Sequence, residues 1–182
     1  LTKKFYEGQV TVAKTKQEQK ENELKLLRSQ IDPHFLFNNL NTVDTLIDTN
    51  PEGAKKYLNR LSKLYRYLTT TKDEEVVLLG EEIDFIEDYI YLIQQRFGDS
   101  FLFDFNISKD IQEASFVPPG SLQGLVENAV KHNQGTPQNP VIIKIYRDAD
   151  WIVVKNNINK REKVIDSTGN GLRNIDTRYK LI

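Results

Sequence analysis

Two short stretches of the sequence combine residue types that can do chemistry. The first, residues 29–41 (SQIDPHFLFNNLN), places a histidine directly after an Asp-Pro step. Proline inside a helix removes a hydrogen bond and clashes with the preceding turn, at a cost of about 3 kcal/mol. We therefore expect a kink or a new helix start here, with Asp32 as N-cap and Pro33 as the first helical residue. His34 would then lie near the positive end of a helix, which favours a phosphate group.

The second stretch is residues 122–133 (LQGLVENAVKHN). Asn128, Lys131 and His132 are spaced so that one helical face presents an amide, an ammonium and an imidazole. The opposing face, which we expect to be buried, carries Leu122, Leu125, Val126 and Ala129. An amide oxygen for hydrated Mg²⁺ beside a cation for a triphosphate is what a nucleotide site needs. An ordinary amphipathic helix with an ion pair between Glu127 and Lys131 explains the same spacing equally well.

Composition excludes several classes of protein. Cysteine is absent, which excludes disulfides, thiolate zinc sites and thiol catalysis, and the two histidines make a histidine-rich metal site implausible. The net charge of −1 gives no general attraction to nucleic acid or anionic membrane. The sequence contains no run of about 18 apolar residues, the length that a membrane-spanning helix requires. Methionine is also absent, even at position 1, so we expect a fragment whose upstream part is missing.

Helices must position the histidine of the first stretch. Residues 11–28 are rich in Lys, Glu and Gln, and they lead into a coiled-coil spacing of Leu24, Leu27 and Ile31. An apolar helical face continues from residue 36 to 47. Residues 48–51 then end this helix and supply the N-cap and the proline first turn of the next one. The second helix carries its own apolar stripe over residues 54–68. Two such helices joined by a short turn should pack antiparallel, and a second copy would complete a dimeric four-helix bundle. The alternative is that the hairpin packs on its own downstream domain.

A charged connector at residues 72–75 sets the expected boundary between a helical part, 1–72, and a second domain, 73–182. For the second domain we predict helices at 81–97 and 121–132, a strand at 101–107, a hairpin of 141–146 and 151–155, and a last helix opened by residues 169–171. Helices segregated from a mostly antiparallel sheet make this an α+β domain.

Both stretches resemble motifs of one protein family. Residues 33–41 (PHFLFNNLN) resemble the phospho-acceptor box of the LytS-type sensor histidine kinases, and residues 127–132 (ENAVKH) resemble the N-box of the GHKL, or Bergerat-type, ATP-binding fold. By this resemblance His34 is the phosphorylated residue, and Asn128 coordinates Mg²⁺. Glu127 would assist in positioning a proton or water. Lys131 and His132 would face the phosphates of ATP.

The remaining motifs are a glycine box and a departure from the family pattern. Residues 167–172 (STGNGL) resemble the second glycine box, in which Gly169, Gly171 and Leu172 would approach a phosphate at a helix N-terminus. At the first glycine box, Asn156 takes the place of the aspartate that reads adenine, and no glycine follows it. Asn156 can accept a hydrogen bond from adenine, although without the charge.

The position after the histidine also departs from the pattern of other histidine kinases, since Phe35 stands where an acidic residue is often found. Asp32 and Glu127 are both candidates for the catalytic base, and the sequence does not choose between them.

The resemblance implies a helical hairpin, dimerised as a four-helix bundle, followed by a GHKL α/β sandwich that is cut short at its C-terminus. The expected function is that of a sensor histidine kinase core at the cytoplasmic side of the bacterial inner membrane. It would use ATP and Mg²⁺ to phosphorylate His34 and pass the phosphoryl group to a response regulator. We expect a homodimer, no nucleic-acid partner, and membrane attachment only through an upstream segment. The alternatives are a degenerate, non-enzymatic dimeric signalling module and an ATPase that forms no phosphohistidine.

Overall fold

The structure is a computed structural model that describes residues 33–160 and 170–180. The chain divides into two compact units, Leu1–Thr45 and Leu46–Ile182, and each is described by itself. The elements in chain order are α2 (Pro33–Thr49), α3 (Pro51–Thr70), β1 (Val77–Leu78), α4 (Leu79–Phe97), η1 (Gly98–Ser100), β2 (Phe101–Asn106), α5 (Lys109–Ala114), β3 (Phe116–Val117), α6 (Ser121–His132), β4 (Val141–Asp148), β5 (Trp151–Asn156) and α7 (Asn170–Tyr179). The α+β class predicted from the sequence is confirmed.

The turn between α2 and α3 has the predicted chemistry. Helix α2 ends at Thr49, and the side chain of Asn50 accepts a hydrogen bond from the backbone N–H of Gly53 at 3.0 Å. Pro51 occupies the first turn of α3, where the missing N–H of proline costs nothing. Asp32, the predicted cap of the preceding helix, lies outside the described residues.

Helix α3 packs against α4 within the second unit. Its buried residues, Ala54, Tyr57, Leu61 and Leu64, all belong to the stripe predicted from the sequence. The ring of Tyr67 stacks on that of Phe85, with centroids 4.2 Å apart, and Arg60 forms an ion pair with Asp88 at 2.5 Å. The sequence left open whether the hairpin packs on its own downstream domain, and the structure shows such packing for α3.

The main sheet has the order β2-β4-β5. Strands β4 and β5 are antiparallel and form the predicted hairpin, with Ala149 in the left-handed region at φ 51° in the turn. Strands β2 and β4 are parallel, so the sheet is mixed rather than mostly antiparallel. The parallel pair is possible because α5, β3 and α6 form the connection between the two strands. A separate two-stranded ladder pairs β1 with β3.

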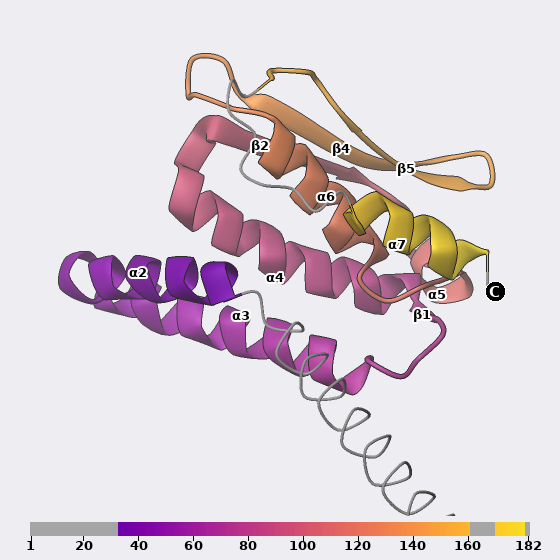
Figure 1. The fold of residues 1–182 in the computed structure, drawn as a ribbon, viewed down its shortest axis with the longest axis horizontal. Helices are drawn as coiled ribbons and strands as arrows, with labels where there is room; N and C mark the ends of the chain where they lie inside the picture. Colours follow the sequence, from indigo (N-terminus) through magenta and orange to yellow (C-terminus); the bar gives the residue numbers. More distant parts are fainter. Residues whose placement is uncertain (1–32, 161–169, 181–182) are drawn as a thin grey trace, which may run out of the picture. The chain divides into compact units, whose positions relative to one another are not determined.

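The core of the second unit lies between the sheet and its helices. Val141, Ile143 and Ile145 alternate along β4 and are fully buried, as are Ile86 of α4 and Val126 of α6. Figure 1 shows α4 and α6 on the same side of the sheet. The pattern is that of a half-covered sheet whose apolar face meets helices. Among residues 33–160 and 170–180, none of the helices combines the length and apolar character needed to cross a lipid bilayer.

Candidate functional site

Helix α6 carries the second chemical stretch, and its bounds are those predicted from the sequence. Leu122, Val126 and Ala129 are buried as expected, whereas Leu125 is only half-buried. The side chains predicted to bind Mg-ATP lie on the accessible side, where Glu127 is exposed and Asn128, Lys131 and His132 are half-buried. The amide of Gln123 donates to the carboxylate of Glu127 at 3.0 Å, one turn away.

The start of α6 is held by a buried carboxylate that the sequence analysis missed. Glu82 of α4 is 0% exposed and accepts hydrogen bonds from the backbone N–H groups of Gly120 and Leu122, each at 2.9 Å. Burial raises the pKa of Glu82, and its hydrogen bonds act in the opposite direction. The sequence does contain a signal, because Glu82 shares its face of α4 with Ile86 and Tyr89, both buried.

The end of α6 is fastened to the chain that follows β5. Asn133 is buried, donates to the carbonyl of Ala129 at 2.8 Å and accepts from the N–H of Asn159 at 2.8 Å. Gln134 and Asn159 exchange two further bonds: the Gln134 N–H donates to the Asn159 carbonyl, and the Asn159 amide donates to the Gln134 carbonyl. These bonds hold the segment after β5 beside the polar end of α6. Sequence reasoning assigned no role to Asn133 or Asn159.

Asn156 is the last residue of β5 and is half-buried. Its amide nitrogen donates to the carbonyl of Asn157 at 2.7 Å. Asn157 in turn accepts from the N–H of Ile142 at 2.7 Å, which ties the strand end to the start of β4. Strand β5 packs against α6, so Asn156 belongs to an element that contacts the helix of Asn128.

Helix α7 lies against α6 (Figure 1). A Cβ atom added to Gly124 would lie 2.9 Å from Ile175 Cδ1, and the Arg178 guanidinium donates to the carbonyl of Pro119 at 2.6 Å. Later residues of α7 therefore meet earlier residues of α6, so the first turn of α7 faces the second half of α6.

The predicted glycine box is therefore only partly placed by the structure. Gly171 and Leu172 belong to the first turn of α7, and Leu172 is exposed. Gly169 lies outside the described residues. The structure thus brings the predicted residues of α6, β5 and α7 into packed elements of one unit. His34 belongs to α2 in the other unit, and the binding roles of all these residues stay predictions.

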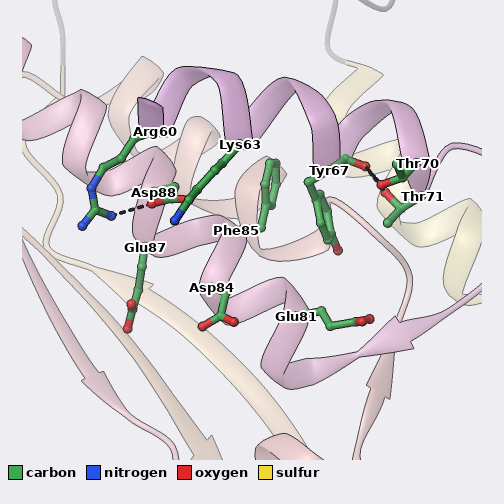
Figure 2. Close-up of a pocket in the computed structure, with 10 residues that line it drawn as sticks. All are labelled: Arg60, Lys63, Tyr67, Thr70, Thr71, Glu81, Asp84, Phe85, Glu87 and Asp88. Atoms are coloured by element: carbon green, nitrogen blue, oxygen red, sulfur yellow. Dashed lines mark hydrogen bonds and ion pairs between the residues drawn. The ribbon is translucent and has the colours of Figure 1, made fainter. Parts of the chain in front are cut away.

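A pocket between α3 and α4 is shown in Figure 2 and contains none of the predicted site residues. Its walls are Arg60, Lys63, Tyr67, Thr70 and Thr71 on α3 and its end, and Glu81, Asp84, Phe85, Glu87 and Asp88 on α4. Cations on one helix therefore face carboxylates on the other. Because Arg60 and Asp88 form an ion pair here, we interpret the groove as part of the contact that holds α3 on α4.

The donor set of α6 fits a metal that is shared with a substrate. In the described part of the chain, no three His, Cys, Asp or Glu residues are grouped as an all-protein metal site requires. Mg²⁺ bound to nucleotide phosphates keeps several waters and needs only one or two protein oxygens. Within residues 33–160 and 170–180, the Asn128 side chain makes no hydrogen bond in the structure, so its amide oxygen can supply such a ligand.

The known proteins that this chain resembles are sensor proteins and histidine kinases. The sequence model of the family described as Histidine kinase matches residues 22–101. The chain is 39% identical over 110 residues to the sensor histidine kinase YpdA of Escherichia coli (strain K12), covering 60% of this chain and 19% of that protein. It is 37% identical over 113 residues to the sensor protein LytS of Staphylococcus haemolyticus, covering 62% of this chain and 19% of that protein.

A longer match extends over most of the chain. The sensor histidine kinase/phosphatase LytS of Staphylococcus aureus (strain Mu50) is 32% identical over 178 residues, covering 88% of this chain and 30% of that protein. The chain thus spans less than a third of the length of these curated relatives. The match of the family model to the stretch around His34, together with these relatives, shows that the chain belongs to the LytS-type histidine kinases.

Proposed function

We propose that this chain is the kinase core of a two-component sensor. It transfers the γ-phosphoryl group of ATP to His34, and a response regulator then takes the group onto an aspartate. The observation that carries the proposal is the match of the histidine kinase model to residues 22–101, because that stretch contains His34. The relatives support it, since those from Escherichia coli and Staphylococcus aureus are named sensor histidine kinases.

In this reaction a neutral ring nitrogen of His34 attacks the γ-phosphorus of ATP. An N–P bond forms, the bond from the γ-phosphorus to its bridging oxygen breaks, and ADP leaves with the electron pair. The imidazole proton passes to a base, for which Asp32 and Glu127 remain the two candidates. In the second step a carboxylate oxygen of the response regulator replaces the His34 nitrogen on phosphorus.

The nucleotide would bind at the second half of α6. Asn128 would hold Mg²⁺ through its amide oxygen, and Lys131 and His132 would face the phosphates. The first turn of α7, with Gly171 and Leu172, would add backbone N–H groups at a helix N-terminus. Its antiparallel packing on α6 supports this arrangement. Bound Mg²⁺ would supply charge neutralisation on the phosphates.

The functional protein would be a homodimer at the cytoplasmic face of a bacterial membrane, attached through a segment upstream of this chain. Large apolar side chains remain exposed on the two helices that flank Asn50. These are Phe37 (65%), Leu40 (46%) and Ile47 (53%) on α2 and Leu58 (45%) on α3. Exposed apolar side chains on a helix can mark an interaction surface, and we propose that a second copy of the chain covers those of each helix.

A degenerate module that dimerises without catalysis is the second candidate. It is favoured by Asn156, since a neutral amide stands where the family has a carboxylate for adenine. A GHKL ATPase without a phosphohistidine is disfavoured by the PHFLFNNLN stretch around His34.

Incubation of the chain with ATP labelled at the γ-phosphate separates these functions. A kinase core yields label on the protein that acid releases and base does not, as expected for a phosphorus–nitrogen bond. A degenerate module yields no labelled protein and no nucleotide binding. An ATPase yields free labelled phosphate alone, and either of these last two results would contradict the proposed function.

A further inference from the structure

A chain of hydrogen bonds links the last turns of α3 to the first turn of α6. The hydroxyl of Tyr67 donates to Glu82 Oε2 at 2.7 Å. The same oxygen accepts from the N–H of Gly120, and Glu82 Oε1 accepts from the N–H of Leu122. One fully buried carboxylate on α4 thus serves three donors that come from two other parts of the fold.

The start of α6 depends on this carboxylate. The first N–H groups of a helix have no partner within the helix and require an acceptor from elsewhere. Gly120 stands at the N-cap position, with φ 76°, and has no side chain with which to cap α6. Glu82 supplies the acceptors instead, and places a carboxylate at the positive end of the helix dipole. The position of α6 is therefore set by a side chain of α4.

The orientation of Glu82 depends in turn on α3. The Tyr67 ring is stacked on Phe85, one turn along α4 from Glu82, with an interplanar angle of 20°. The stacking aims the Tyr67 hydroxyl at the carboxylate. Burial and the neighbouring Glu82 carboxylate raise the pKa of Tyr67, which keeps the hydroxyl a donor. A rotation or shift of the end of α3 would therefore move or release Glu82.

We propose that Glu82 is a positioning residue through which Tyr67 couples the end of α3 to the placement of α6, and so to the affinity of α6 for Mg-ATP. The coupling to Mg-ATP rests on the proposed function of α6. Asn128 lies six residues after Leu122, about 9 Å along the helix, so a tilt at the start of α6 displaces it. A helix that leads from the phospho-acceptor segment would thereby influence the nucleotide site, and linkage requires the reverse as well.

Two conservative variants isolate the link. Tyr67→Phe keeps the stacked ring and removes only the hydroxyl that reaches Glu82. Tyr91→Phe is the matched control, because it removes a hydroxyl from the same α3–α4 contact, where Lys56 and Arg60 lie over the Tyr91 ring. Tyr91 is nine residues further along α4 than Glu82, about 14 Å away along the helix axis.

The first measurement is amide hydrogen exchange at Gly120 and Leu122, observed by NMR in the whole chain without nucleotide. We expect Tyr67→Phe to accelerate exchange at both amides about ten-fold, as the loss of a hydrogen bond to a charged acceptor implies. Tyr91→Phe should leave both rates unchanged. Unchanged rates in Tyr67→Phe, or equal acceleration in the control, would overturn the proposal.

The second measurement is a double-mutant cycle of Tyr67 and Glu82 on the dissociation constant of Mg-ATP. A general loss of stability would not produce the non-additive effect that direct coupling of the two residues predicts. Tyr67→Phe should raise this constant about three-fold to ten-fold in the wild-type background, and leave it unchanged when Glu82→Gln is already present. Additive effects, or faster exchange without weaker binding, would overturn the coupling. A wild-type chain that does not bind Mg-ATP would instead contradict the proposed function. The exchange rates would then still decide whether Tyr67 positions α6.

Discussion

At the scale of single residues, the proposed role of Asn156 predicts the affinity of the nucleotide site. Its amide nitrogen already donates to the exposed Asn157, which leaves the side-chain oxygen to face a ligand. Hydrogen bonds to charged partners contribute about 1.5–3 kcal/mol against about 1 kcal/mol for neutral ones. If Asn156 reads adenine as proposed, its neutral amide would make a weaker bond to the adenine amino group than a carboxylate would.

We accordingly expect Asn156→Asp to tighten Mg-ATP binding about five-fold to ten-fold without a change of fold. The substitution also removes the hydrogen bond that the Asn156 amide donates to the carbonyl of Asn157, and the carbonyl of this exposed residue can accept a hydrogen bond from water instead. Calorimetric titration of both proteins with Mg-ATP measures the difference. Equal dissociation constants would mean that Asn156 does not read adenine.

Tyr67 gives a prediction about pH. Its folded pKa lies above the ordinary value of 10.0, because the hydroxyl is buried beside Glu82. Stability from the protonated hydroxyl is therefore complete below pH 10.0 and falls as the pH rises above it, since only the unfolded chain ionises there.

The midpoint of urea unfolding should consequently fall more steeply above pH 10.0 for the wild type than for Tyr67→Phe. The absorbance of tyrosinate provides the control. A Tyr67 with a raised pKa does not ionise near pH 10.0, so the folded wild type and folded Tyr67→Phe should show the same rise in absorbance there. If Tyr67 instead ionised at its ordinary pKa, the rise in absorbance would be smaller in Tyr67→Phe by the contribution of one tyrosine, and that result would contradict the prediction.

At the scale of elements, two glycines test how tightly the second unit is packed. Gly135 follows α6, and a Cβ atom there would overlap the backbone carbonyl of Ser100 and approach the backbone nitrogen of Val141. Backbone atoms cannot rotate away, and overpacking costs about 1–3 kcal/mol. Gly135→Ala should therefore lower the melting temperature by several degrees, at about 2–4 °C per kcal/mol for a chain of this size.

Gly124→Ala is the matched comparison for Gly135→Ala. The new methyl group would come within 4 Å of Ile175 alone and closest to its terminal Cδ1, and this side chain can change rotamer. Replacing glycine by alanine inside a helix gains about 1 kcal/mol, which offsets the crowding. The melting temperature should stay within about 2 °C of the wild type. Equal losses in the two variants, measured by circular dichroism, would contradict this account of the packing.

The elements that were predicted correctly have their determinants within a few residues. Asn50 and Pro51 fix the turn before α3, and the apolar spacing of α6 defines its length. Helix α5 was missed because it is too short to show a helical period. The parallel pairing of β2 with β4 was missed because it depends on residues that are far apart in the sequence.

The site was predictable to the same degree. The polar spacing of α6 is visible in the sequence, whereas the Glu82 carboxylate reaches across some 40 residues to its backbone partner Leu122. The Asn133–Asn159 bond likewise joins residues that are 26 positions apart. Sequence periodicity cannot report such bonds, since each depends on how helices and strands pack.

At the scale of the whole molecule, we predict a dimer with twice the monomer mass of 21.1 kDa in light scattering at micromolar concentration. Phe37→Glu, at an exposed apolar position of α2, should shift the mass toward the monomer, because a second copy would have to bury a charge. Trp151→Glu is the control, since Trp151 is 75% exposed on β5 and should not affect the mass. A monomeric wild type would contradict the proposed dimer.

The central claim is that His34 accepts the phosphoryl group. The chain contains only two histidines, so a phosphohistidine must be at His34 or His132. The decisive measurement is incubation of His34→Gln with ATP labelled at the γ-phosphate, beside the wild type and with Mg-ATP affinity measured in parallel. We predict that His34→Gln binds Mg-ATP like the wild type and acquires no acid-labile label. Label that persists on His34→Gln would contradict the account.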